Sequence, residues 1–282
     1  MVARICWPNC SNELTLIKVP YARMNSQTIS LFRFLMLGIL SKRLFVLLAV
    51  MVLTAVLGGS FINELAIING AAVQAAFVAD FLRYSLALLV LLMIASSVAE
   101  DYEFRQFERL LTMPLARWQY IAAQTLVIAC LCLLLTLPVA LLVPLYGDAA
   151  VGFYWAVALW LELFLLGILG FLAILSLEKI PQAVIFSLAI YLLAKFSGLI
   201  SLMLSESVKL SEGSVGSRVV EFIFSAILYV IPGSKTFARN DVFFASQDLI
   251  ALLGGQLASV SIYALFLLAV CLIDFYRKEF NL

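Results

Sequence analysis

The sequence contains six long apolar stretches, each close to the length that a helix needs to cross a lipid bilayer. They cover residues 44–61, 81–98, 120–145, 151–177, 181–204 and 250–273. About 20 consecutive apolar residues span the roughly 30 Å hydrocarbon core of a membrane. Only 12% of the 282 residues are charged and 65% are hydrophobic, whereas a soluble domain is about a quarter charged. The pattern predicts an all-α integral membrane protein with six transmembrane helices.

The chain before the first span divides into two parts. Residues 1–23 are mixed polar, which indicates a cytosolic tail, and Met24 is a candidate for the natural start. Residues 25–43 carry a narrow polar stripe that includes Arg33, so we expect an interfacial helix there. Residues 24–282 would then form a single transmembrane domain.

The basic residues predict the orientation of the chain in the membrane. With the N-terminus inside, the inner segments 1–43, 100–118, 178–179 and 274–282 hold 12 of the 18 Lys and Arg residues. Four more fall in one long outer stretch, 205–249. Because Lys and Arg in short segments favour the cytosolic side, we expect both termini in the cytosol.

The long outer stretch contains a second apolar run, residues 219–231, which ends at Pro232-Gly233. About 13 residues are too few to span the bilayer, so the run predicts a re-entrant or interfacial helix before the sixth span. The alternative is a seventh, tilted span. It would place the C-terminus outside, against the basic bias of Arg277 and Lys278.

The cytosolic connection between the second and third spans, residues 100–117, has the pattern of a short amphipathic helix. Phe104, Phe107 and Leu111 fall on one face, and charged side chains fall on another. Pro114 should end the helix. Such a segment could offer a docking surface to a partner, or it could be a solvated linker between spans.

The same connection resembles a segment of ABC-2-type permeases, the membrane subunits of type V ABC exporters. Leu110, Leu111, Pro114 and Arg117 match the pattern Leu-Leu-x-x-Pro-x-x-Arg that follows acidic residues after span two in that family. The family's usual Gly-Thr pair is replaced here by Arg105-Gln106. An interfacial helix before six spans, with a re-entrant element before the last, is similar to the family's order.

The resemblance implies that the chain is the permease subunit of an ATP-driven exporter in a bacterial inner membrane. It implies a coupling helix that docks on a separate ATPase, built from Glu103, Phe104, Phe107, Glu108, Arg109, Leu110, Leu111, Pro114 and Arg117. Two copies of the ATPase and a second permease chain, forming a homodimer, are the implied partners. The sequence has no Gly-x4-Gly-Lys-Ser/Thr phosphate loop, so we expect ATP and Mg²⁺ to bind to the partner and no cofactor to bind here.

Two other functions stay open. Leu137-Pro138 and Val143-Pro144 in the third span are similar to the heme-exporter permease of cytochrome c maturation. A membrane scaffold or assembly factor that transports nothing would also fit a multi-pass chain.

Several classes of function are disfavoured by composition. The sequence has no histidine, which removes histidine-based zinc sites and leaves serines in the spans without a histidine partner. A Ser–Lys dyad would have to use Lys195, so we do not expect an enzyme. No basic patch with interleaved aromatic residues is present, so we expect no nucleic-acid partner. The five cysteines show no complete metal-binding spacing, and we expect free thiols.

Two charged residues lie deep within predicted spans. Glu162 and Lys195 are equally distant in sequence from the turn at 178–179, so an antiparallel hairpin would place them at one depth. A pair there could line the transport path or stiffen a moving hairpin, because charges inside membranes are usually functional. The alternative is that Lys195 extends to the outer surface while Glu162 is protonated or bonded to backbone.

Other polar and aromatic residues near the ends of spans have simpler interpretations. Asp80 and Arg83 stand at the start of the second predicted span, so we expect them at the outer rim. Trp118 and Tyr120 fit an aromatic belt at the inner interface.

Overall fold

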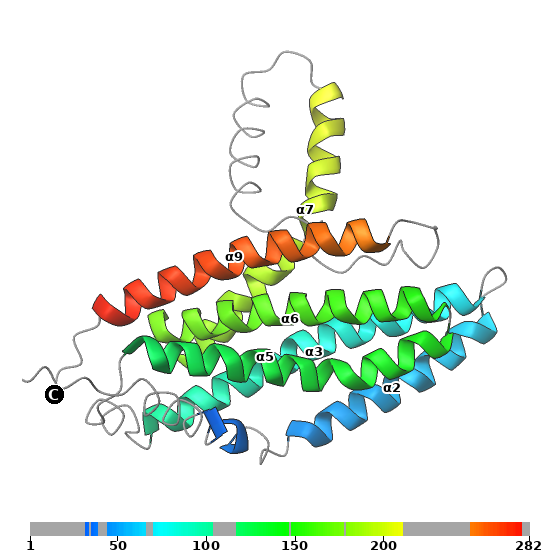
Figure 1. Cartoon of the computed structure of the whole chain (residues 1–282). Helices are drawn as coiled ribbons and strands as arrows, with labels where there is room; N and C mark the ends of the chain where they lie inside the picture. Colours follow the sequence, from blue (N-terminus) through cyan, green and yellow to red (C-terminus); the bar gives the residue numbers. More distant parts are fainter. Residues whose placement is uncertain are drawn as a thin grey trace, which may run out of the picture.

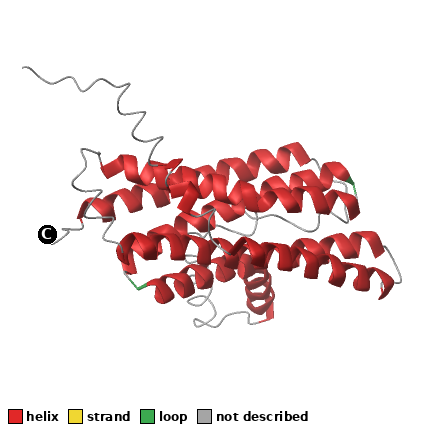
Figure 2. Ribbon diagram, turned by 90° about the horizontal axis from the view of Figure 1, so that it is seen from below, coloured by secondary structure: helices red, strands yellow, loops and turns green. Residues whose placement is uncertain are grey.

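The computed structural model describes residues 32–33, 35–38, 44–65, 70–103, 117–146, 148–177, 179–210 and 249–277. Helices make up nearly all of these residues, and no strand occurs among them (Figures 1 and 2). The elements are α2 (Leu44–Leu65), α3 (Gly70–Glu103), α5 (Arg117–Leu142), the 3-10 turn η1 (Val143–Tyr146), α6 (Ala149–Leu177), α7 (Ile180–Leu210) and α9 (Leu249–Arg277).

Among the described residues, five helices are long and apolar enough to cross a membrane. They are α2, α3, α5 continued by η1, α6 and α9. The predicted fifth span corresponds to α7, within which the fully described residues form an apolar stretch, Ile180–Phe196, that is shorter than a span. The second half of α7 leaves the bundle in Figure 1. The all-α, multi-pass architecture is therefore present, whereas a sixth span stays a prediction.

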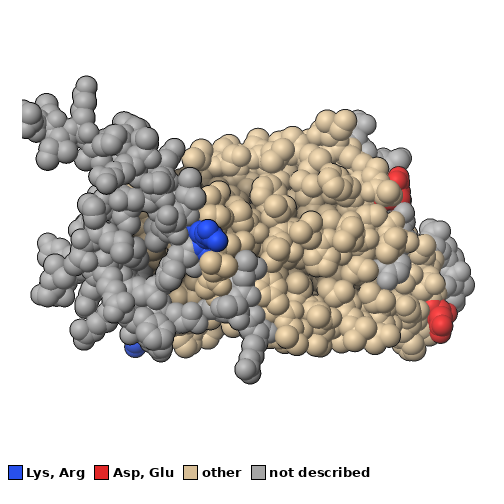
Figure 3. Space-filling view, turned by 60° about the horizontal axis from the view of Figure 1, so that its bottom comes forward, with Lys and Arg blue, Asp and Glu red and all other residues tan. Residues whose placement is uncertain are grey.

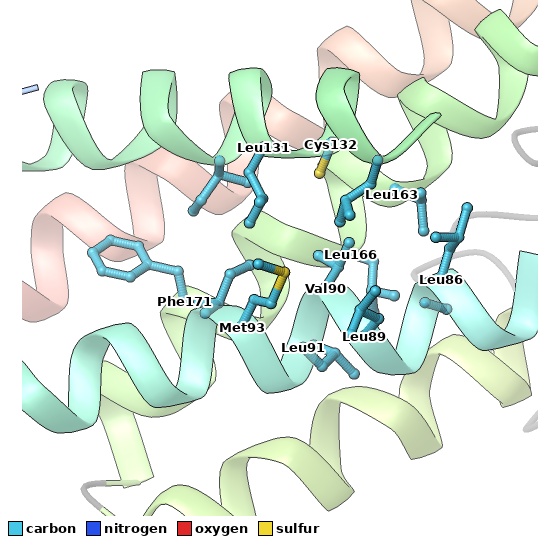
Figure 4. Close-up of a cluster of buried hydrophobic side chains, with 14 of the residues drawn as sticks. Leu86, Leu89, Val90, Leu91, Met93, Leu131, Cys132, Leu163, Leu166 and Phe171 are labelled. Atoms are coloured by element: carbon cyan, nitrogen blue, oxygen red, sulfur yellow. The ribbon is translucent and has the colours of Figure 1, made fainter. Parts of the chain in front are cut away.

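The helix α6 forms the centre of the bundle. In its most apolar window 72% of the residues are buried, against 11% in α2, which packs on α3. Close approach of α6 to its neighbours depends on two glycines. A Cβ at Gly167 would lie 2.5 Å from Ile128 of α5, and one at Gly170 would lie 2.7 Å from Leu91 of α3. Figure 4 shows the resulting core, where leucines and other apolar side chains of α3, α5 and α6 meet.

The helix α3 begins at Gly70, well before the predicted start of the second span at residue 81. Its first turns are not continuously apolar, but they pack closely on α2. A Cβ at Gly59 of α2 would lie only 2.5 Å from Val78. The prediction that Asp80 and Arg83 lie at the rim is therefore wrong, because α3 begins ten residues before Asp80 and Arg83 is buried inside the bundle.

The two residues of the predicted aromatic belt differ in exposure. Trp118 is half-exposed near the start of α5, as an interfacial residue would be. Tyr120 is instead buried, because α6 and α9 cover it. Its ring stacks on Phe275 with 5.9 Å between centroids and contacts Phe171 at 6.4 Å.

Charged residues mark the two ends of the bundle. Arg117 begins α5, Lys179 precedes α7 and Arg277 is the last residue of α9, and the antiparallel order brings these positions to one end. Glu64 and Asp148 stand at the opposite end. On the face shown in Figure 3, the visible Lys and Arg residues (blue) lie in the left part and the Asp and Glu residues (red) at the right edge, with an uncharged described surface between them.

Three predicted segments lie wholly or partly outside the described residues. They are the tail 1–23, most of the amphipathic connection 100–117, and the outer apolar run 219–231. Within the predicted interfacial helix, residues 32–33 and 35–38 are helical.

Candidate functional site

Three helices bring charged side chains to one depth in the bundle. Arg83 is thirteen residues after Gly70 in α3, and Glu162 is thirteen residues after Ala149 in α6, about 20 Å along each helix from the same end. The helix α7 starts from the opposite end of the bundle. Lys195 is fifteen residues after Ile180, and Glu162 is fifteen residues before Leu177, so the two side chains lie at the same depth. Both Arg83 and Glu162 lie next to the midpoints of the candidate spans of α3 and α6.

The pairing of Glu162 with Lys195, predicted from their level positions, is present. Lys195 Nζ lies 2.9 Å from Glu162 Oε1 and 3.0 Å from Oε2. Tyr191, one helical turn before Lys195, donates a hydrogen bond from its hydroxyl to Glu162 Oε1 at 2.6 Å. The carboxylate of α6 is thus held by two side chains of α7.

The helix α3 contributes the other half of the cluster. Arg83 Nη1 donates to Asp80 Oδ1 at 2.9 Å, and Arg83 Nε lies 3.9 Å from Glu162 Oε2. The guanidinium also lies over the indole of Trp155, 5.1 Å from the ring centroid, in a cation–π contact. Arg83 therefore connects Asp80 on its own helix to Glu162 and Trp155 on α6.

Burial explains why these charges occur together. The side chains of Glu162, Arg83 and Lys195 are 0%, 5% and 9% exposed, whereas that of Asp80 is 46% exposed. A single charge at the centre of a membrane helix costs roughly 2.5–3.5 kcal/mol. Two acids and two bases in contact give a formally neutral cluster, which lowers that cost. We call Asp80, Arg83, Glu162, Tyr191 and Lys195 the charge cluster.

The geometry favours one role of the charge cluster over others. Glu162 already accepts bonds from Lys195 and Tyr191, so its carboxylate is occupied within the protein. The alternative in which Lys195 extends to the outer surface is wrong, because the ammonium is buried against Glu162. The cluster joins the α6–α7 hairpin to α3; a role in transport stays a prediction.

Three members of the cluster, Asp80, Arg83 and Tyr191, were not assigned to it from the sequence. Tyr191 lies four residues before Lys195, the spacing that puts two side chains on one helix face, and this signal was available. Arg83 was placed at the rim because the start of α3 was predicted too late. Trp155, one of many aromatic residues in an apolar helix, has no distinguishing signal in its sequence context.

The predicted coupling residues are described only at the two ends of their segment. Glu103 is the last residue of α3 and Arg117 the first of α5. Those between them lie outside the described residues: Phe104, Phe107, Glu108, Arg109, Leu110, Leu111 and Pro114. The two described positions stand at the same end of the bundle as Lys179 and Arg277.

Comparison with known proteins gave no relative. No protein-family model matches the chain, and no curated protein or solved structure matches it.

Proposed function

We propose that the chain is the permease subunit of an ABC-2-type exporter, driven by a separate ATP-hydrolysing subunit in a bacterial inner membrane. The observation that carries the proposal is the Leu-Leu-x-x-Pro-x-x-Arg run of residues 110–117. It connects α3 to α5 at the end of the bundle where basic residues gather. The absence of a phosphate loop from the sequence means that ATP hydrolysis needs a partner.

The proposed mechanism passes motion from the loop to the middle of the membrane. Closure of two ATPase subunits would push on residues 103–117, which begin and end at the termini of α3 and α5. Because Arg83 of α3 contacts Glu162, and Glu162 binds Lys195, a shift of α3 would reach the α6–α7 hairpin. A second copy of the chain would face this one across the transport path.

The test is whether the loop couples ATP hydrolysis to transport. The chain is purified from its native membrane with any associated ATPase, reconstituted, and compared with Leu111→Ala and Arg109→Ala variants. Both variants should keep ATP hydrolysis but lose most transport per ATP hydrolysed. The matched control is Leu265→Ala, an exposed position on α9 away from the loop. Unchanged coupling in both loop variants would contradict the proposal.

A further inference from the structure

One face of α3 is left open by the other described helices. Its large apolar residues recur at the three- and four-residue spacing of a helix face and are each between 37% and 42% exposed. They are Phe77, Phe81, Tyr84, Leu88 and Leu92.

Asp80 lies at the edge of this face and differs from the rest of the charge cluster. Its side chain is 46% exposed, whereas the other three charged side chains are at most 9% exposed. It precedes the midpoint of the Gly70–Val98 span by four residues, about 6 Å along the axis. The hydrocarbon core extends about 15 Å on either side of the midplane, so a span centred in the bilayer would place Asp80 within the core.

A half-exposed carboxylate at this depth is energetically unfavourable beside lipid tails, because hydrocarbon cannot solvate its charge. The bond from Arg83 occupies Asp80 Oδ1 and leaves further acceptor positions on the carboxylate. The Asp80–Arg83 pair is neutral overall, but Arg83 is buried and Asp80 is half-exposed. The pair therefore presents its negative end to the open face, which suits a ligand that brings a positive charge.

The residues next to Asp80 indicate which kind of positively charged ligand the face could bind. Phe77 and Tyr84 stand three residues before and four residues after it, which places them on the same side of α3. The rings of Phe77 and Phe81 stack with 6.4 Å between centroids. A carboxylate beside aromatic rings binds organic cations, because the ring faces attract positive charge while the carboxylate neutralises it.

We propose that Asp80, Phe77, Phe81 and Tyr84 bind the positive group of an amphiphilic organic cation. The apolar part of the ligand lies along Leu88 and Leu92, which continue the same face of α3. The inference rests on the proposed function in that it names the class of cargo the exporter would carry.

The test is direct binding, which needs neither ATP nor an ATPase. The purified full chain in detergent is equilibrated with radiolabelled tetraphenylphosphonium, a lipophilic cation, and the wild type is compared with Asp80→Asn. The variant should bind at least about tenfold more weakly, because it loses the carboxylate charge that attracts the cation. Phe81→Leu should bind several-fold more weakly while keeping the carboxylate. The control Glu64→Gln removes an acid at the end of α2 and should bind as the wild type does.

A second control uses the charge of the probe. Tetraphenylmethane, dissolved in the detergent, has the same shape without the charge, and it should not displace the bound cation. If Asp80→Asn disturbs the fold, Phe81→Leu still tests the site, because it changes the aromatic face and keeps the carboxylate. Equal binding by the wild type, Asp80→Asn and Phe81→Leu would overturn the inference, as would no binding by the wild type. An associated ATPase without cation binding would overturn this inference alone, and cation binding without an ATPase would overturn only the exporter proposal.

Discussion

At the scale of single residues, Glu162 is the centre of the charge cluster. It contacts two cations from two helices, and both its oxygens are engaged by Lys195. This changes how the pair should be tested. Exchanging the charges of Glu162 and Lys195 would put a lysine beside Arg83, so the exchange would fail even though the pair exists. Neutral replacements avoid this like-charge contact.

We predict that Glu162→Gln is more destabilising than Lys195→Met. The first leaves two buried cations with only Asp80 to balance them, and breaking a buried pair in this way costs roughly 3–5 kcal/mol of unfolding free energy. The second leaves Glu162 with Arg83 and Tyr191. Adding Lys195→Met to Glu162→Gln should recover part of the loss, because it removes one of the unbalanced cations.

The measurement is the free energy of unfolding of the three variants in detergent. Glu64→Gln, which removes a carboxylate at the exposed end of α2, serves as the control and should change little. Strictly additive losses in the double variant would show that Glu162 and Lys195 do not interact.

At the scale of elements, the central position of α6 depends on glycines, which allow the neighbouring helices to approach closely. Gly167 faces both Ile128 of α5 and Ile94 of α3. In a membrane, where lipid tails are as apolar as leucine, close packing is a main source of attraction between helices. The charge cluster is held in place by this packing, since Glu162 stands on the same helix five residues before Gly167.

We predict that Gly167→Ala destabilises the bundle by about 1–3 kcal/mol. The added Cβ would lie 2.5 Å from Ile128 Cγ2 and 3.3 Å from Ile94 Cδ1, so α6 must move away. The matched control is Gly254→Ala in α9, where nothing lies within 4 Å. Because alanine favours a helix over glycine, the control should be neutral or slightly stabilising. Equal unfolding temperatures for the two variants would contradict the packing of α6.

The sequence predicts elements well where an apolar run and a helix coincide. This holds for α6, which begins at Ala149 against a predicted 151 and ends at Leu177 as predicted. It fails for α3, whose first turns contain alanines and single polar residues and are kept helical by packing on α2. Because of that error, Arg83 was predicted to lie at the rim. The Glu162–Lys195 contact was predictable because symmetric spacing about a turn fixes depth in a hairpin.

At the scale of the whole molecule, Lys and Arg mark one end of the bundle. Arg117, Lys179 and Arg277 stand there together with the acidic residues at the end of α3, whereas Glu64 and Asp148 stand at the other end. Basic residues in short segments favour the cytosolic side. The loop between α3 and α5 is at the end with the Lys and Arg residues, so the proposed ATPase docking site is on the side that we predict to be cytosolic.

We predict opposite accessibility for two cysteine variants at the two ends of α6. Ala150→Cys, exposed at its start, should react with a membrane-impermeant maleimide in intact cells. Lys179→Cys, exposed just beyond its end, should react only after permeabilisation. The unaltered chain measures labelling of the native cysteines. The reverse pattern would place the basic end outside and remove the ATPase docking site from the cytosol.

The most direct test of the exporter proposal is the composition of the intact complex. The chain is purified at its native abundance in mild detergent, and the mass and stoichiometry of the complex are measured by native mass spectrometry. The proposal predicts two copies of this chain and two copies of an ATP-hydrolysing subunit. A complex of this chain without any ATPase would contradict it and favour a membrane scaffold.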